Sequence, residues 1–141
     1  MLYPEYLKHT HPCPFCARPD RIVKRARTAY LTYSLAPYSA YHLLIVPKRH
    51  VESVSKLMPQ EFRDMVFLMR VAMRIYAKKR IADYSFLLRN GKNSGKSVRH
   101  VHMNVVPRHR LGDLDQNSDM RKVLDDRRIA RLLAELKTLA S

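Results

Sequence analysis

The spacing of apolar residues changes from segment to segment along this chain, and each spacing predicts a kind of element. In Thr28–Leu35 (TAYLTYSL) β-branched and aromatic residues are frequent, which favours a strand. His42–Val46 (HLLIV) is a short apolar run ended by Pro47, which is typical of a central strand covered on both faces. With three further segments of similar character, the predicted strands are Arg21–Lys24, Thr28–Leu35, His42–Val46, Tyr84–Arg89 and Val98–Val106.

Between Pro59 and Ile81 the apolar positions take up the spacing of a helix. Pro59 suits a first helical turn, and the i, i+3, i+4 pattern predicts one apolar stripe that faces the core. The alternative is a soft binding surface, since methionine adapts its shape to a partner. The stripe consists of Phe62, Met65, Val66, Met69, Met73 and Tyr76. After a polar linker at Gly112–Ser118, a second helix is predicted from about Asp119 to Leu139.

This order of elements predicts the α+β class. Neighbouring strands joined without intervening helices favour an antiparallel sheet, here of about five strands, with one long central helix and a C-terminal helix. The chain has 141 residues, enough for one domain with its own hydrophobic core. The main part of the domain is expected at residues 1–112. It includes an N-terminal segment at 1–19, which contains the Cys-Pro-Phe-Cys motif. The linker and helix of residues 113–141 are expected to pack on the same domain.

Lysine and arginine outnumber the acidic residues, 27 against 12, and give the chain a formal net charge of +15. Such an excess attracts phosphates, nucleotides and nucleic acid, so non-specific nucleic-acid contact through the basic surface is one expectation. No apolar run approaches the ~18–20 residues that span a bilayer, and the first residues lack the pattern of a secretory signal. We therefore expect a cytoplasmic protein with no membrane partner.

The run SVRHVHMNVVPR carries the most informative polar residues. As a strand, it would point His100, His102 and Asn104 to one face and the intervening apolar residues to the other. An imidazole is uncharged, nucleophilic and metal-binding near neutral pH, so such a row suits nucleophilic or metal chemistry. A solvated strand face whose histidines have no function is the alternative.

Cys13 and Cys16, in Cys-Pro-Phe-Cys, form a tight knuckle that can present two thiolates to one ion. A redox pair is the alternative, although no thioredoxin-like pattern surrounds the motif. A tetrahedral zinc site would need two further ligands, typically imidazoles.

Several motifs, taken in their order, resemble the histidine triad (HIT) superfamily of nucleotidyl hydrolases and transferases. The family pattern alternates histidine with apolar residues after a Gly-Gln-Ser-Val-like lead. The matching pieces are Cys13–Cys16, Ile45–His50 (IVPKRH), Gly95–Val98 (GKSV) and His100–Val106 (HVHMNVV), so the resemblance covers roughly residues 12–110. It implies a HIT-like fold and a nucleotide-processing enzyme.

The resemblance implies that His102 attacks the α-phosphate of a nucleotide and forms a covalent nucleotidyl-histidine. A fixed acceptor must then hold the other ring nitrogen, which in the family is a backbone carbonyl. Asn104 departs from the pattern, since most members have a third histidine there and the transferase-like branches have glutamine. An amide donates a hydrogen bond but does not protonate a leaving group, which favours a transferase or phosphorylase as the alternative to a hydrolase.

Other positions follow from the same resemblance. Ser97 is a third catalytic candidate, because its hydroxyl can donate to a phosphate. Lys96 stands where the family commonly has Gln, and Ser34 where it has an acidic residue that holds the ribose. Phe15 and Leu35 match positions that pack near the base, with an ordinary core role as the alternative. The implied nucleotide-binding set is Phe15, Ser34, Leu35, Asn90, Gly95, Lys96 and Ser97.

For the cysteine knuckle, the resemblance implies the complete ligand set of a structural zinc, namely Cys13, Cys16, His50 and His100. A structural zinc has no open coordination position, so it is expected to take no part in catalysis. The remaining histidines are interpreted as surface or local structural residues: His9, His11, His42 and His109.

The leading hypothesis is therefore an enzyme that acts on a dinucleoside polyphosphate, a nucleoside phosphoramidate or a similar adduct. Two alternatives stay open. One is a nucleotidyltransferase or phosphorylase, and the other is a binding module that holds nucleotide or nucleic acid with little turnover. A homodimer is expected from the resemblance alone.

Overall fold

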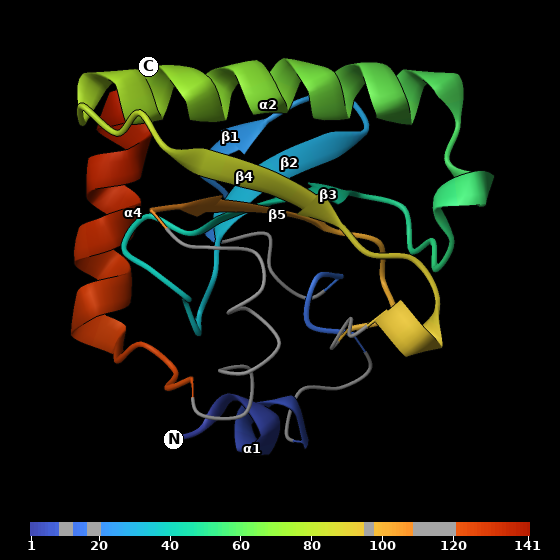
Figure 1. Ribbon diagram of the computed structural model, residues 1–141, viewed down its shortest axis with the longest axis horizontal. Coiled ribbons are helices and arrows are strands. Elements are labelled where there is room, and N and C mark those ends of the chain that lie inside the picture. The colour runs from blue at the N-terminus through green and yellow to red at the C-terminus, as the bar shows by residue number, and fades with distance from the viewer. Residues whose placement is uncertain (9–12, 17–20, 95–97, 109–120) are drawn as a thin grey trace.

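The computed structural model describes residues 1–8, 13–16, 21–94, 98–108 and 121–141, arranged as Figure 1 shows. Five strands form one antiparallel sheet in the order β1-β2-β3-β5-β4. They are β1 (Lys24–Arg25), β2 (Ala29–Tyr33), β3 (Leu43–Pro47), β4 (Tyr84–Leu88) and β5 (Met103–Pro107). The prediction of an α+β fold with an antiparallel sheet of about five strands is therefore confirmed.

In the described residues, α-helices lie on both sides of the sheet and at one end. Helix α2 (Pro59–Lys78) lies along one face, α4 (Asp126–Ala140) stands at one end, and α1 (Tyr3–Lys8) lies on the side away from α2 (Figure 1). Single turns of 3-10 helix form η2 (Val54–Lys56) and η3 (Lys92–Ser94). In the described part of the chain, no helix is both long enough and apolar enough to cross a membrane.

The central strand β3 separates two cores, because alternate side chains of a strand point to opposite faces. Leu43 and Ile45 belong to the main core beneath α2. Leu44 and Val46 belong to a second, smaller core on the other face, which the segment at 13–16 covers. All five residues of β3 are buried, so the prediction of a strand covered on both faces is confirmed.

The apolar stripe predicted for α2 splits between two environments. Met65 and Tyr76 are buried, and the residues between them that complete the core-facing side are Leu68, Val71, Ala72 and Ile75. Phe62, Val66 and Met73 instead expose 44%, 54% and 43% of their surface, so the prediction that they face the core is wrong. The sequence pattern contained two adjacent apolar faces, and only one of them meets the sheet.

The C-terminal helix begins later than predicted, at Asp126 instead of about Asp119. Asp125 caps it by accepting a hydrogen bond from the backbone N–H of Arg128 at 2.8 Å. The residues before the cap run along the N-terminal segment: the N–H of Tyr3 donates to the carbonyl of Arg121 at 2.9 Å. The N-terminus is thus anchored by the chain that precedes α4.

Strand β5 is shorter than the predicted Val98–Val106, because the chain bends before it. The N–H of Val101 donates to the carbonyl of Val51 at 2.8 Å instead of joining the sheet ladder. His100 and His102 therefore precede the strand, and only Asn104 lies within it. The predicted row of three side chains on one strand face is wrong in this respect, and other contacts must position the two histidines.

Candidate active site and metal cluster

Two cysteines and two histidines from three segments of the chain converge beside the sheet. The Sγ of Cys13 lies 3.5 Å from Nδ1 of His100, and the Sγ of Cys16 lies 3.4 Å from Nδ1 of His50. One ligand atom from each of the four residues fits within 4.8 Å of all the others. Bonds of about 2.3 Å to sulfur and 2.0–2.1 Å to nitrogen at a tetrahedral angle would separate S and N by about 3.6 Å. The cluster therefore fits one tetrahedral metal ion.

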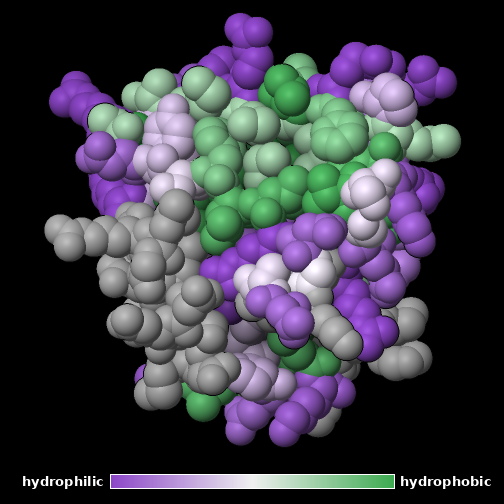
Figure 2. All heavy atoms as spheres, turned by 45° about the vertical axis from the view of Figure 1, so that its right-hand side comes forward, coloured by the Kyte–Doolittle hydropathy of each residue, from purple (hydrophilic) through white to green (hydrophobic). Residues whose placement is uncertain are grey.

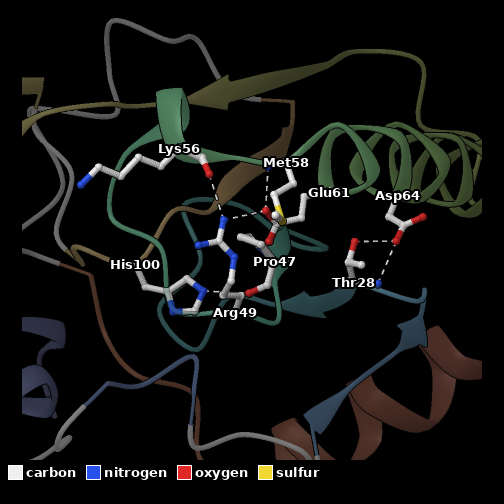
Figure 3. Close-up of polar contacts among 8 residues, drawn as sticks. All are labelled: Thr28, Pro47, Arg49, Lys56, Met58, Glu61, Asp64 and His100. Atoms are coloured by element: carbon white, nitrogen blue, oxygen red, sulfur yellow. Dashed lines mark hydrogen bonds and ion pairs between the residues drawn. The ribbon is translucent and has the colours of Figure 1, made fainter.

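His100 is held in the form that binds a metal. Its Nε2 donates to the carbonyl of Pro47 at 2.8 Å (Figure 3). The lone pair of Nδ1 is thereby left facing the two cysteines. Burial lowers the pKa of His100, and His50 nearby adds to this, although the hydrogen bond to Pro47 acts in the opposite direction. Burial raises the pKa of the Cys16 thiol to about 11, and a hydrogen bond and charge repulsion with Cys13 act in the same direction. A metal ion must therefore displace a proton from this thiol.

An ion pair between Arg49 and Glu61 fixes the segment that contains Pro47 and His50. Arg49 lies between Pro47 and His50, and its Nη2 donates to Oε1 of Glu61 at 2.8 Å and to the carbonyl of Lys56 at 2.9 Å (Figure 3). The same carboxylate oxygen accepts from the backbone N–H of Met58 at 2.8 Å. The end of β3 is thereby tied to the first turn of α2.

A backbone carbonyl sets the tautomer of the His102 ring. Its Nδ1 lies 2.9 Å from the carbonyl of His100, and a carbonyl only accepts, so Nδ1 carries the proton and Nε2 keeps its lone pair. The side chain is 8% exposed, and its ring centroid lies 5.0 Å from that of Phe15. Phe15 thus lies against His102, on the same side of the sheet as the smaller core.

Asn104 is oriented by His42, a residue that the sequence did not single out. The N–H of Tyr38 donates to Nδ1 of His42 at 3.2 Å, so the proton of the neutral ring is on Nε2. That nitrogen lies 2.9 Å from Oδ1 of Asn104 and donates to it. The amide oxygen is thereby used within the protein, and the amide NH₂ is the group that Asn104 can offer a ligand.

The remaining predicted nucleotide contacts are dispersed. Ser34 is buried and accepts a hydrogen bond from the N–H of Ala36 at 3.3 Å, close to His42 in the turn between β2 and β3. Leu35 belongs to the main core beneath α2, on the other side of the sheet from His102. Asn90 accepts from the N–H of Val54 at 2.8 Å. Gly95, Lys96 and Ser97 lie outside the described residues, as do His9, His11 and His109.

The interpretation of His42 as a surface or local residue missed its contact with Asn104. His42 is 2% exposed and lies one position before β3. Leu44 is the partner of Asn104 in the ladder, so His42 faces the same side two residues away. The sequence showed which residues of each strand share a face. It did not show the register that pairs β3 with β5.

The HIT domain family model matches residues 17–111, which is more than half of the chain. The chain therefore belongs to the HIT family. This confirms the resemblance inferred from the cysteine knuckle, the IVPKRH segment and the histidine motif.

Similar proteins include enzymes and a metal-bound structure. The Bis(5'-adenosyl)-triphosphatase of Dictyostelium discoideum is 26% identical over 129 residues, which cover 91% of this chain and 86% of that protein. The AP-4-A phosphorylase of Mycobacterium tuberculosis is 30% identical over 89 residues, which cover 62% of this chain and 46% of that protein. A Zn-bound histidine triad family protein from Mycobacterium smegmatis has a TM-score of 0.66 at 25% identity and covers 90% of this chain and 94% of its own.

The network around Glu61 predicts a pH-dependent contribution to stability. Burial alone would raise the pKa of Glu61, but the hydrogen bonds from Arg49 and Met58 outweigh it and lower the pKa below the usual value of about 4.3. A carboxyl whose pKa is lower in the folded state stabilises the fold above about pH 4.3, and this contribution is lost as the pH falls through the folded-state value. Glu61→Gln should therefore lower the urea midpoint at pH 7, and the difference should shrink towards pH 3.

The matched control is Asp83→Asn, which removes an exposed carboxylate outside this network. Its urea midpoint should stay close to that of the unchanged protein at both pH values. A Glu61→Gln difference that is constant from pH 7 to pH 3 would show that the carboxylate charge contributes nothing.

Proposed function

We propose that this protein cleaves a nucleotide substrate at its α-phosphate, with Nε2 of His102 as the nucleophile. The observation that carries the proposal is the 2.9 Å contact between Nδ1 of His102 and the carbonyl of His100, which leaves Nε2 unprotonated. Nε2 forms a bond to phosphorus as the bond from phosphorus to the leaving-group oxygen breaks. A water molecule then attacks phosphorus, breaks the P–N bond and releases the nucleotide.

The chemistry of the Asn104 side chain indicates which kind of leaving group the site accepts. Its NH₂ can donate to a phosphoryl oxygen, because His42 occupies the amide oxygen, but an amide has no proton to transfer near neutral pH. A phosphate chain departs as a stable anion without protonation, whereas an amine departing from a phosphoramidate needs a proton. We therefore infer a phosphoric anhydride substrate, such as a dinucleoside polyphosphate, in preference to a phosphoramidate. The name of the Dictyostelium relative, a bis(5'-adenosyl)-triphosphatase, supports the same substrate class.

Transfer to phosphate is the second candidate, and Asn104 also favours it. If inorganic phosphate attacks the nucleotidyl-histidine, the product is a nucleoside diphosphate instead of a monophosphate. The similarity to an AP-4-A phosphorylase over 62% of the chain supports keeping this candidate. Product analysis with and without added phosphate distinguishes the two acceptors. A binding module would give neither product at a useful rate.

Diadenosine triphosphate and an adenosine phosphoramidate test the mechanism together. The unchanged protein should cleave the anhydride at least about 100-fold faster than the phosphoramidate, the range expected for a missing general acid. His102→Ala should reduce turnover by ~10³-fold or more and abolish labelling by an α-³²P substrate, while nucleotide binding stays largely intact. Asn104→His should raise phosphoramidate cleavage selectively, because an imidazole transfers protons near neutral pH.

Two results would refute these proposals separately. Unchanged turnover in His102→Ala would remove the nucleophile from the mechanism. Equal rates on the two substrates in the unchanged protein would leave the nucleophile in place but overturn the inference about the leaving group.

We further propose that the cluster of Cys13, Cys16, His50 and His100 holds a structural zinc ion. Two sulfur and two nitrogen ligands in a tetrahedral arrangement suit zinc. The similar structure from Mycobacterium smegmatis is described as Zn-bound. When bound, zinc would join the knuckle to the His50 and His100 segments, and its closed ligand set leaves no position for a substrate.

Metal analysis of the purified protein should give one zinc per chain, and Cys16→Ser should abolish it. Because metal-binding energy becomes folding energy, a chelator should lower the Tm of the unchanged protein by at least about 6 °C, the shift expected from a loss of ~2 kcal/mol. The variant should already melt at the lower temperature, and the chelator should leave it unchanged. Zinc affinity should fall as the pH falls, because protons compete for the Cys16 thiolate, whose pKa is raised to about 11 without the metal. A metal-free protein with the same Tm would contradict the site.

Finally, we propose that a second copy of the chain covers the exposed face of α2 and the outer edge of β4. β4 is the last strand in the sheet order, and such an edge offers unpaired backbone groups. Figure 2 shows apolar side chains in a continuous area across the upper half of the molecule, where Figure 1 places α2 and β4. Phe62, Val66 and Met73 share one exposed side of α2.

Light scattering during size-exclusion chromatography should give the mass of a dimer. Val66→Glu should convert it to a monomer, because a charge would be buried in an apolar contact. Ala130→Glu, which adds the same charge to an exposed position on α4, should leave the dimer intact. A monomeric unchanged protein at tens of micromolar would contradict the proposal.

A further inference from the structure

A cleft lies between the connection of β2 to β3 and the C-terminal helix α4. It has a volume of about 510 Å³, within the ~300–1,000 Å³ typical of small-molecule sites. Ser34, Tyr41 and His42 line one side, and Arg128 and Arg131 from α4 line the other. Both arginines lie beyond residues 17–111, the part of the chain that the HIT domain matches.

The cleft adjoins the candidate active site through one buried side chain. His42 is 2% exposed, lines the cleft, and donates from Nε2 to Asn104 at 2.9 Å. A ligand in the cleft would therefore lie one side chain away from the amide that can hold the reacting phosphate.

The polar lining of the cleft favours an anion. Among the described residues, no carboxylate lines the cleft and Arg131 makes no ion pair. Arg128 approaches Asp125 only to 3.9 Å, with both side chains more than two-thirds exposed at 73% and 68%. A cation in the first turn of a helix is unfavourable, and an anion bound beside it would offset this. Guanidinium groups match the oxygens of a phosphate through paired hydrogen bonds.

The walls of the cleft suit the organic part of a nucleotide. Tyr41, Leu124 and Leu132 give it apolar surface. Tyr41 adopts a left-handed backbone with φ of 65°, which is strained for a bulky residue. Two hydrogen bonds hold it there: its hydroxyl donates to Glu135 at 2.9 Å, and its carbonyl accepts from the hydroxyl of Tyr76 at 2.8 Å. These contacts fix the position of Tyr41 in the wall of the cleft.

We propose that Arg128 and Arg131 hold a second phosphate group of the nucleotide substrate, one other than the phosphate that reacts. This second phosphate is carried either on the sugar or farther along the 5' chain. The inference rests on the proposed function, because it takes the ligand to be a nucleotide that also reaches His102. It makes α4 a determinant of which nucleotides the protein accepts.

Calorimetric titration at fixed ionic strength tests this by binding, without any need for turnover. The probes are adenosine 5'-monophosphate, adenosine 5'-diphosphate and adenosine 3',5'-bisphosphate. At least one of the two compounds with a second phosphate should bind about tenfold more tightly than the monophosphate, and the double variant Arg128→Gln/Arg131→Gln should lose that gain. A gain seen with the bisphosphate places the second phosphate on the sugar, and a gain seen with the diphosphate places it in the 5' chain.

The matched control is Arg127→Gln/Lys137→Gln, which removes two exposed positive charges from the same helix outside the cleft. It should keep the full gain, because the effect depends on position and not on net charge. Equal affinity for all three compounds would overturn the proposal, as would a gain that both double variants lose alike. Turnover of the anhydride substrate, measured separately, shows whether the proposed function holds independently of this result.

Discussion

One residue, His100, connects the cysteine knuckle, the end of β3 and His102 through three of its polar atoms. Its Nδ1 faces the cysteines at 3.5 and 3.6 Å, and its Nε2 donates to the carbonyl of Pro47 at 2.8 Å. Its own carbonyl lies 2.9 Å from Nδ1 of His102. A metal ion bound at Nδ1 would therefore stabilise the backbone bend that sets the tautomer of His102. The backbone of this single residue thus connects the candidate metal cluster to the proposed nucleophile.

A chain of two hydrogen bonds orients Asn104. It begins at the backbone N–H of Tyr38 and passes through the ring of His42. Tyr38 determines which nitrogen of His42 carries the proton, and His42 determines which end of Asn104 faces a ligand. In the proposed mechanism, His102 is the nucleophile and Asn104 a hydrogen-bond donor, and no acid lies among the residues described around them. Such a site would suit leaving groups that are stable as anions, which is a property of phosphate chains.

Much of this protein was determined by the sequence alone. Local patterns depend on neighbouring residues, so they predicted β2, β3, α2 and β4 to within a few residues of their observed ends. The joint occurrence of the cysteine knuckle, the IVPKRH segment and the histidine motif predicted the family and the four-residue metal cluster. The four-residue cluster could be predicted because structural zinc sites favour sulfur and nitrogen ligands, which cysteine and histidine supply.

Only the tertiary structure decided which side chains meet across the sheet. The pairing of Leu44 with Asn104 brings His42 into the site, and no local pattern contains that register. The bend before β5 replaces the strand that the alternation of His100 and His102 predicted, because Val101 bonds to Val51 from a distant segment. Phe62 and Val66 have the spacing of core residues, yet the sheet covers only the adjacent face of α2. The register, the bend and the exposed face of α2 all depend on contacts between residues far apart in the chain. The local spacing of apolar residues contains no information about such contacts.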